Sequence, residues 1–174
     1  QNLNVIEILP RQNGKTIGAV CVFSYIYELV TENSAMIFSN KELADSQLNL
    51  KRYKEIVELL PSYLRRTHSN DKNNINMIES VKSKNSIKAL STGRDRESAD
   101  KLGRGLTVPL MWFDEFAFLK FNNEIYESAT FALSAAAERA RAQGKPFFKL
   151  ITTTPKLLGH KLVTTYANFS NCWE

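Results

Sequence analysis

Three short clusters of polar residues in this chain carry the side-chain types that phosphate chemistry uses. The first follows an apolar stretch and reads Arg11, Gln12, Asn13, Gly14, Lys15, Thr16. Backbone amides and the positive end of a helix bind phosphates, a lysine contacts the outer phosphates, and a hydroxyl ligates magnesium. Lys15 and Thr16 are adjacent and have the types for the last two roles. We therefore predict a phosphate-binding loop at residues 11–16.

The Gly-Lys-Thr triplet of this loop is a weak signal when it stands alone. The usual loop has a glycine six positions before the lysine, and here that position is Leu9. In the ordinary alternative, Gly14 merely begins a helix and Lys15 is solvated. The apolar strand before the triplet and the helix after it favour the phosphate loop.

The second cluster is a pair of carboxylates, Asp114 and Glu115, at the end of an apolar run. Phosphoryl transfer needs an acidic group that holds magnesium and, for hydrolysis, a group that takes a proton from the attacking water. We assign the first role to Asp114 and the second to Glu115. The alternative is a surface pair that opens the next helix, where the helix dipole favours negative charge.

The third cluster is Thr152, Thr153 and Thr154, followed by Pro155. Hydroxyls at a strand end close to bound phosphate can respond to the outer phosphate and transmit its presence to a moving segment. On propensity alone, three β-branched residues simply finish a strand. Their position after the last apolar strand is what favours the coupling role.

Length and composition limit the class of protein that can hold these clusters. The chain has 174 residues, a net charge of +5 and 43% hydrophobic residues. This composition excludes a disordered or fibrous chain, and no apolar run approaches the roughly 18 residues of a membrane span. Cys21 and Cys172 are too isolated for a disulfide framework or a zinc site. The first residue is not Met and begins an apolar stretch, so we expect a fragment of a longer protein.

Hydrophobic periodicity predicts alternating strands and helices. We expect a fully buried helix at residues 15–32, an amphipathic surface helix at 41–60 that ends at Pro61, and a third helix from residue 125 to near Gly144. A loop is expected at 62–74 and another at 91–105. Strands are expected at residues 3–9, 35–39, 75–81, 87–90, 108–113 and 147–151, the third and fourth forming a hairpin.

This order indicates an α/β domain with a mainly parallel sheet, whose ligands lie at the carboxyl ends of the strands. We expect Trp112 in the core and His68 and His160 on the surface. Glu138, Arg139 and Arg141 read as an exposed helix end.

Taken together, the clusters resemble the ATPase domain of the large terminase subunit, the DNA-packaging motor of tailed bacteriophages. The matching pieces are R-Q-N-G-K-T, the Arg104–Gly105 pair, W-F-D-E-F-A-F with Glu115, and I-T-T-T-P, within residues 5–155. The resemblance implies a RecA-like fold and Mg²⁺-dependent ATP hydrolysis that drives double-stranded DNA into a procapsid. It further implies a ring of several copies, contacts with the portal protein and the small terminase subunit, and a location at the portal in the host cytoplasm.

Two parts of the family pattern are missing or incomplete in this sequence. Family members carry an adenine-contacting segment before the first strand and a lid built partly from residues beyond the coupling threonines. We expect the lid and a nuclease domain beyond the C-terminus, and we expect this piece alone to be monomeric.

The resemblance also assigns roles to arginines. Arg104, between two glycines, is predicted to contact the ATP of the adjacent subunit, with Arg11 as the competing candidate within its own subunit and pairing with Asp100 as the ordinary alternative. Arg94 and Arg96 can contact DNA phosphates or a neighbour, although loop arginines are more often solvated.

Other functions remain open. A helicase-type translocase shares all three clusters but needs a second RecA-like domain, and a nucleoside kinase has no use for a glutamate that activates water. A scaffold that binds DNA or capsid protein without hydrolysis is the alternative from another class. Intact Lys15, Thr16, Asp114 and Glu115 disfavour it.

Overall fold

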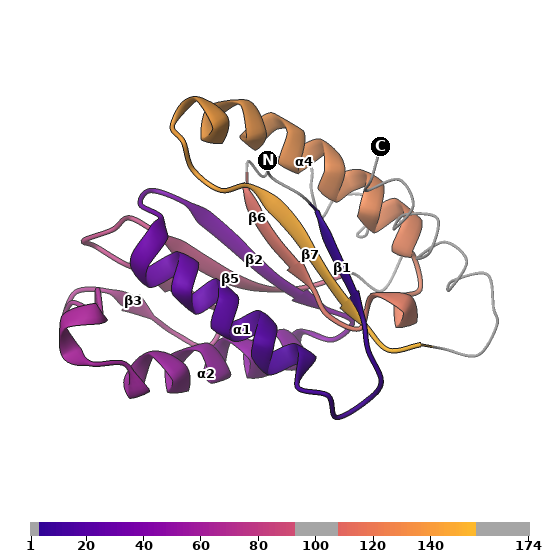
Figure 1. The fold of residues 1–174 in the computed structure, drawn as a ribbon, viewed down its shortest axis with the longest axis horizontal. Helices are drawn as coiled ribbons and strands as arrows, with labels where there is room; N and C mark the ends of the chain where they lie inside the picture. Colours follow the sequence, from indigo (N-terminus) through magenta and orange to yellow (C-terminus); the bar gives the residue numbers. More distant parts are fainter. Residues whose placement is uncertain (1–3, 93–107, 156–174) are drawn as a thin grey trace.

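A seven-stranded sheet organises the domain (Figure 1). The computed structural model describes residues 4–92 and 108–155. The strand order is β1-β7-β6-β2-β5-β4-β3, in which β1, β7, β6, β2 and β5 are parallel and the last two pairings are antiparallel. The strands are β1 (Val5–Ile8), β2 (Ala35–Asn40), β3 (Lys72–Asn73), β4 (Met77–Glu79), β5 (Ser86–Ser91), β6 (Leu110–Phe113) and β7 (Phe148–Thr153). The predicted α/β class with a mainly parallel sheet is confirmed.

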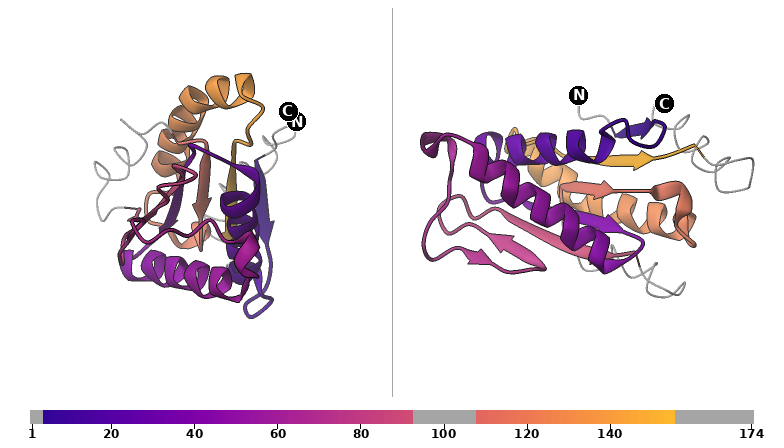
Figure 2. Two further views of the ribbon diagram at one scale, coloured as in Figure 1. Left: turned by 90° about the vertical axis from the view of Figure 1, so that its left-hand side faces the viewer. Right: turned by 90° about the horizontal axis from the view of Figure 1, so that it is seen from below.

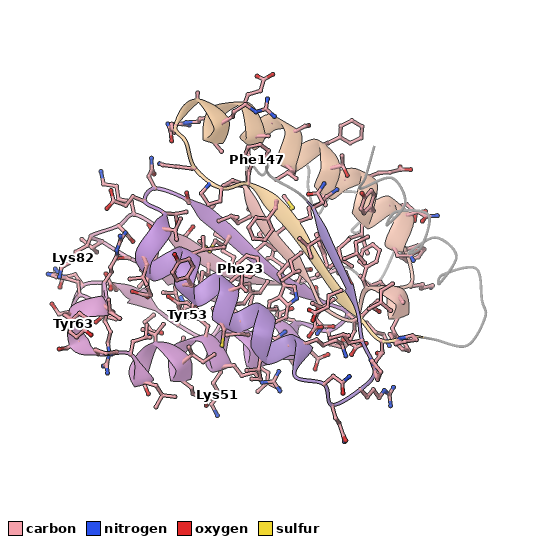
Figure 3. The ribbon with its side chains drawn as sticks, viewed as in Figure 1. Phe23, Lys51, Tyr53, Tyr63, Lys82 and Phe147 are labelled. Atoms are coloured by element: carbon pink, nitrogen blue, oxygen red, sulfur yellow. The ribbon has the colours of Figure 1, made fainter. Side chains whose placement is uncertain are left out.

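Helices cover both faces of this sheet (Figure 2). The helix α1 (Lys15–Tyr25) and the helix α2 (Leu43–Leu59) pack on one face, and α4 (Asn122–Ala142) packs on the other. Side chains alternate along each strand, so that Phe38 and Trp112 face the first layer while Ile37 and Met111 face the second. Phe23 of α1 contacts the rings of Phe38 and Trp112 (Figure 3). Trp112 is fully buried, as predicted.

The helix predicted at residues 15–32 differs from the observed one in two ways. The α-helix ends at Tyr25 and continues as one π-helical stretch, Ile26–Val30. The prediction of a fully buried helix was wrong, because Ile17, Val22 and Tyr25 are 49%, 46% and 60% exposed. These side chains lie on the face of α1 that points away from the sheet, and an apolar sequence does not reveal which face is covered.

The other elements lie close to their predicted positions. The helix α2 ends before Pro61, because the residue before a proline disfavours helical backbone. Its predicted apolar stripe is buried at Leu50, Tyr53 and Val57, whereas Leu43 is 39% exposed. The hairpin prediction is confirmed by the antiparallel pairing of β4 and β5.

The expected loop at residues 62–74 is not entirely irregular. It contains a short 3-10 helix, Ser62–Leu64, and the edge strand β3. A second 3-10 turn, Phe116–Phe118, follows the carboxylate pair. Among the described residues, no helix has the length and apolarity that crossing a membrane requires.

Candidate functional site

The three predicted clusters meet at one edge of the sheet. The phosphate loop follows β1, the carboxylates follow β6, and the threonines end β7, and these three strands are neighbours in the order β1-β7-β6. Since the strands are parallel, their carboxyl ends lie at the same edge. Residues 98 positions apart in sequence are thereby brought within hydrogen-bond distance, as the contact between Thr16 and Asp114 shows.

The Asp114 carboxylate is 4% exposed and accepts four hydrogen bonds. Thr16 donates to Oδ2 at 3.2 Å and Asn49 donates to the same oxygen at 3.4 Å. Thr152 donates to Oδ1 at 2.7 Å, and the Glu115 backbone N–H donates to Oδ1 at 3.0 Å. Four donors from separate segments therefore fix the position and orientation of this buried carboxylate.

The Glu115 carboxylate is engaged at both oxygens. Lys15 Nζ lies 3.3 Å from Oε1, and the Thr154 hydroxyl donates to Oε2 at 2.8 Å. The Lys15 side chain is 7% exposed and that of Glu115 35% exposed. The backbone of Glu115 is left-handed, with φ 52° and ψ 40°, which is uncommon for a residue other than glycine. This turn aims the two consecutive carboxylates in different directions.

The threonines at the end of β7 bind groups of the site in sequence. Thr152 also accepts a hydrogen bond from Trp112 Nε1 at 2.9 Å, and Thr153 accepts one from the Ala117 backbone N–H at 3.1 Å. Together with the contact from Thr154 to Glu115, each hydroxyl is tied to β6 or to the segment that follows it. The expected proximity of the threonines to the carboxylates is therefore present, and two of the three hydroxyls contact the carboxylates themselves.

The phosphate loop has the backbone shape that its glycine allows. Gly14 caps α1 with φ 74°, and a side chain there would be strained although the surrounding space is open. Gln12 is also left-handed, with φ 64°. Arg11, Gln12 and Asn13 are exposed at the mouth of the site.

A pocket of about 360 Å³ adjoins the carboxylates. Its walls come from the phosphate loop, the end of β2, the helix α2 and the turn after β6. The lining residues are Arg11, Asn40, Lys41, Asp45, Leu48, Asn49, Arg52, Asp114, Glu115 and Phe118.

The helix α2 brings two residues to this pocket that the sequence did not identify. Asn49 is 2% exposed and bonds Asp114, and Arg52 donates from Nη1 to Asn49 Oδ1 at 2.8 Å. The available signal was that polar Ser46 and Asn49 interrupt the apolar stripe that Leu50, Tyr53 and Val57 continue. A polar residue on a buried stripe needs a partner, and for Asn49 the partner is the site.

Two oxygen ligands of the kind that magnesium prefers converge at this site. The Thr16 hydroxyl and the Asp114 carboxylate lie 3.2 Å apart, and Asp114 is held rigidly. This donor set fits a hard divalent cation. Nitrogen and sulfur ligands, which transition metals favour, are absent from the side-chain contacts of these two residues among the described residues, apart from the Asn49 amide.

Some predicted residues lie outside the described part of the chain. They are Arg94, Arg96, Asp100, Arg104, Cys172 and His160. His68 is exposed, as predicted, and so are Glu138, Arg139 and Arg141.

Solved structures with the same fold are ATPase domains and complete chains of phage large terminases. A mutant ATPase domain of the Thermus phage P74-26 large terminase matches with a TM-score of 0.64 and 18% identity, over 91% of this chain and 62% of that chain. The HK97 bacteriophage large terminase matches with a TM-score of 0.63 and 15% identity, over 97% of this chain and 33% of that chain. The large terminase of a thermophilic bacteriophage gives 0.60 and 18%, over 88% of this chain and 34% of that chain.

The predicted RecA-like architecture is thus confirmed, and the chain spans less than two thirds of each of these structures. No curated protein sequence matches the chain. Residues 8–171 match the family described as terminase large subunit, T4likevirus-type, N-terminal. Because this match covers nearly the whole chain, the protein belongs to the N-terminal region of that terminase large subunit family.

Proposed function

We propose that this chain is the ATP-hydrolysing part of a DNA-packaging motor. The observation that carries the proposal is the pairing of Lys15, a phosphate-loop lysine, with Glu115, the carboxylate placed to activate water. A large terminase from a thermophilic bacteriophage has been solved in complex with ADP. By family membership, we extend nucleotide binding at the corresponding edge of the sheet to this chain.

In the proposed reaction, the outer phosphates of ATP draw Lys15 away from Glu115. Oε1 of Glu115 is then free to accept a proton from water, while Thr154 keeps the other oxygen in place. The water oxygen forms a bond to the outer phosphorus, the bond from that phosphorus to the ADP oxygen breaks, and Glu115 later returns the proton to solvent or phosphate. Gly14, Lys15 and Thr16 hold the phosphates together with the exposed segment 11–13.

Thr16 and Asp114 would hold Mg²⁺, which supplies positive charge that offsets the negative charge of the phosphates. The chain's contribution is to keep the Asp114 carboxylate oriented, through the four donors described above. Thr152 ties that carboxylate to the coupling segment Thr152, Thr153 and Thr154.

The motor's other parts are proposed from the family. They are a ring of several copies at the portal of a procapsid in the host cytoplasm, the portal protein, the small terminase subunit, and double-stranded DNA as the translocated substrate. A lid and a nuclease domain are proposed to follow this part of the chain.

We further propose that Arg104, which lies outside the described residues, stabilises the transferring phosphoryl group on the adjacent subunit. Arg11, which lines the pocket beside Glu115, is the candidate within the same subunit. Mixed rings of full-length Arg104→Ala and Glu115→Gln subunits test the choice, because one interface then contains both intact residues. Recovered hydrolysis supports Arg104, and its absence in assembled rings moves the role to Arg11.

The test of the function itself uses the full-length protein with procapsids, portal and linear duplex DNA. ATP should protect the DNA from added nuclease, and Lys15→Ala should abolish both the protection and nucleotide binding. Strand separation without procapsid-dependent protection would indicate a helicase-type translocase. Nucleotide binding by Lys15→Ala at parental affinity would refute the site.

A further inference from the structure

The pocket beside the carboxylates contains more positive charge than the sequence clusters supply. Arg11, Lys41 and Arg52 all line it. None of these three cations forms an ion pair with a carboxylate among the described residues. Three carboxylates line the pocket as well, but the consecutive pair after β6 already has other partners, and Asp45 lies beyond ion-pair distance of all three cations. Unpaired cations around a pocket favour a polyanionic ligand.

Arg52 is the cation that the structure holds in place. Its Nη1 donates to Asn49 Oδ1 at 2.8 Å, and Asn49 Nδ2 donates to Asp114 Oδ2 at 3.4 Å. Because the amide oxygen accepts from Arg52, the amide nitrogen must face Asp114. A chain of two hydrogen bonds thus joins a guanidinium in the pocket to a buried carboxylate at the carboxyl end of β6.

The guanidinium of Arg52 has capacity left for a ligand. It carries five N–H groups in a planar fork that matches a phosphate. Within residues 4–92 and 108–155, the contact to Asn49 is its one hydrogen bond. Arg52 is partly exposed, and α2 continues beyond it to Leu59, so the side chain springs from a rigid element.

The position of the pocket indicates which phosphate it faces. The water in a hydrolysis attacks the outer phosphorus from the side opposite the departing ADP, so the residue that takes the water's proton marks the outer end of the triphosphate. Glu115 is that residue in the proposed mechanism, and Glu115 and Arg52 line the same pocket. Arg52 therefore lies on the side of the outer phosphate.

We propose that Arg52 contacts the outer phosphate of ATP within its own subunit, and that Asn49 is a positioning residue that links this contact to Asp114. The inference rests on the proposed function. It gives α2 a direct means to distinguish ATP from ADP, because only ATP has the phosphate that Arg52 reaches.

The first experiment compares nucleotide affinity in the full-length protein, using ATPγS and ADP with Mg²⁺. Arg52→Gln should weaken ATPγS binding about tenfold or more, the scale of a lost charge-assisted hydrogen bond, and should leave ADP binding within about twofold. Lys51→Gln is the matched control, because Lys51 is the neighbouring cation on α2, is 70% exposed and pairs with Glu55 (Figure 3). It should change neither affinity.

Equal losses for both nucleotides, or no loss for either, would overturn the role of Arg52. If Arg52→Gln does not fold, Arg52→Lys decides the question, since it keeps the charge and loses the fork: the preference for ATPγS over ADP must fall. Lys15→Ala separates the two levels of the argument. If Lys15→Ala loses nucleotide binding and the Arg52 variants do not lose discrimination, only the present inference fails.

The second experiment addresses Asn49 through the Mg²⁺ requirement of ATPγS binding. Asn49→Ala should raise the half-saturating Mg²⁺ concentration about tenfold, which is typical for loss of a group that orients a metal ligand. Ser46→Ala is the matched control, because Ser46 is fully buried on the same face of α2 and bonds the Leu90 carbonyl at 2.6 Å. An unchanged Mg²⁺ requirement in Asn49→Ala, or an equal change in Ser46→Ala, would refute the positioning role.

Discussion

Glu115 shows at the residue scale how the site stores its geometry. A left-handed backbone at a residue other than glycine costs on the order of 1–3 kcal/mol and persists when surrounding contacts determine it. Here those contacts are Lys15 at one carboxylate oxygen, Thr154 at the other, and the backbone hydrogen bond from Phe118 N to Glu115 O at 2.9 Å. The strain falls on the residue whose direction matters most for the proposed chemistry.

Glu115→Gln should abolish turnover and spare nucleotide binding. The amide oxygen can still accept a hydrogen bond from Lys15 or Thr154, yet the amide cannot take a proton from water. Loss of a general base costs about a hundredfold to ten-thousandfold in rate. Steady-state hydrolysis and ATPγS binding by the full-length variant check this, and hydrolysis at the parental rate would exclude Glu115 as the base.

Thr152→Val should destabilise the fold as well as the site. The hydroxyl accepts from Trp112 Nε1 and donates to Asp114, and Trp112 and Thr152 are both fully buried. Removal leaves an indole N–H and a carboxylate oxygen each short of a partner, at about 1–3 kcal/mol per group. Urea unfolding of the ligand-free protein measures the loss. Thr152→Ser, which keeps the hydroxyl, should recover most of it.

The sequence was sufficient for residues whose type and neighbours state their chemistry. The lysine and threonine of the phosphate loop and the two carboxylates stand at strand ends, and periodicity locates strand ends well. It was insufficient for Asn49 and Arg52, because a polar residue on a helix reads as surface until the partner is known. The contact of Thr154 with Glu115 depends on the register of β7 beside β6, which no local pattern encodes.

At the scale of elements, a buried polar network joins the end of α1 to the hairpin far from the site. Asn85 is fully buried, donates to the Tyr27 and Thr31 carbonyls at 2.9 and 2.7 Å, and accepts from the Ser34 backbone N–H at 3.0 Å. Tyr53 of α2 donates to the buried Glu28 at 2.7 Å. The π-helical stretch Ile26–Val30 turns these groups inward, which the apolar pattern of residues 15–32 did not predict.

This network predicts a loss of stability in alkali. Burial, and next the negative charge of Glu28, raise the pKa of Tyr53 and of Tyr27 above the ordinary 10.0. The unfolded chain releases these protons near pH 10 and the folded chain retains them, so rising pH beyond about 10 favours unfolding, by about 1.4 kcal/mol per pH unit for each tyrosine.

Tyr53→Phe should reduce the slope of unfolding free energy against pH above pH 10 by about 1.4 kcal/mol per unit. It should also lower stability at neutral pH, because Glu28 loses a donor. Denaturant titrations from about pH 8 to about pH 11 measure both effects. Tyr63→Phe, at an 83% exposed position, is the control, and an identical slope in the two variants would contradict the assignment.

At the scale of the whole molecule, the described domain has its own core on both faces of the sheet. It spans 62% of the Thermus phage ATPase domain, 33% of the HK97 chain and 34% of the chain from the thermophilic bacteriophage. We therefore predict that the isolated 174 residues fold, are monomeric in dilute solution, and hydrolyse ATP slowly or not at all. Sedimentation velocity and a phosphate-release assay check this prediction, and robust turnover by the isolated chain would contradict it.

The bridge between Lys15 and Glu115 has a consequence for product release. When ADP departs, the lysine loses its phosphate partner, and a largely buried ammonium without a counter-charge would hold the product back. Glu115 lies 3.3 Å away and can take the vacant place. The emptied site is therefore neutralised from within, so that the residue that starts one turnover by activating water also eases the exchange of spent nucleotide for fresh.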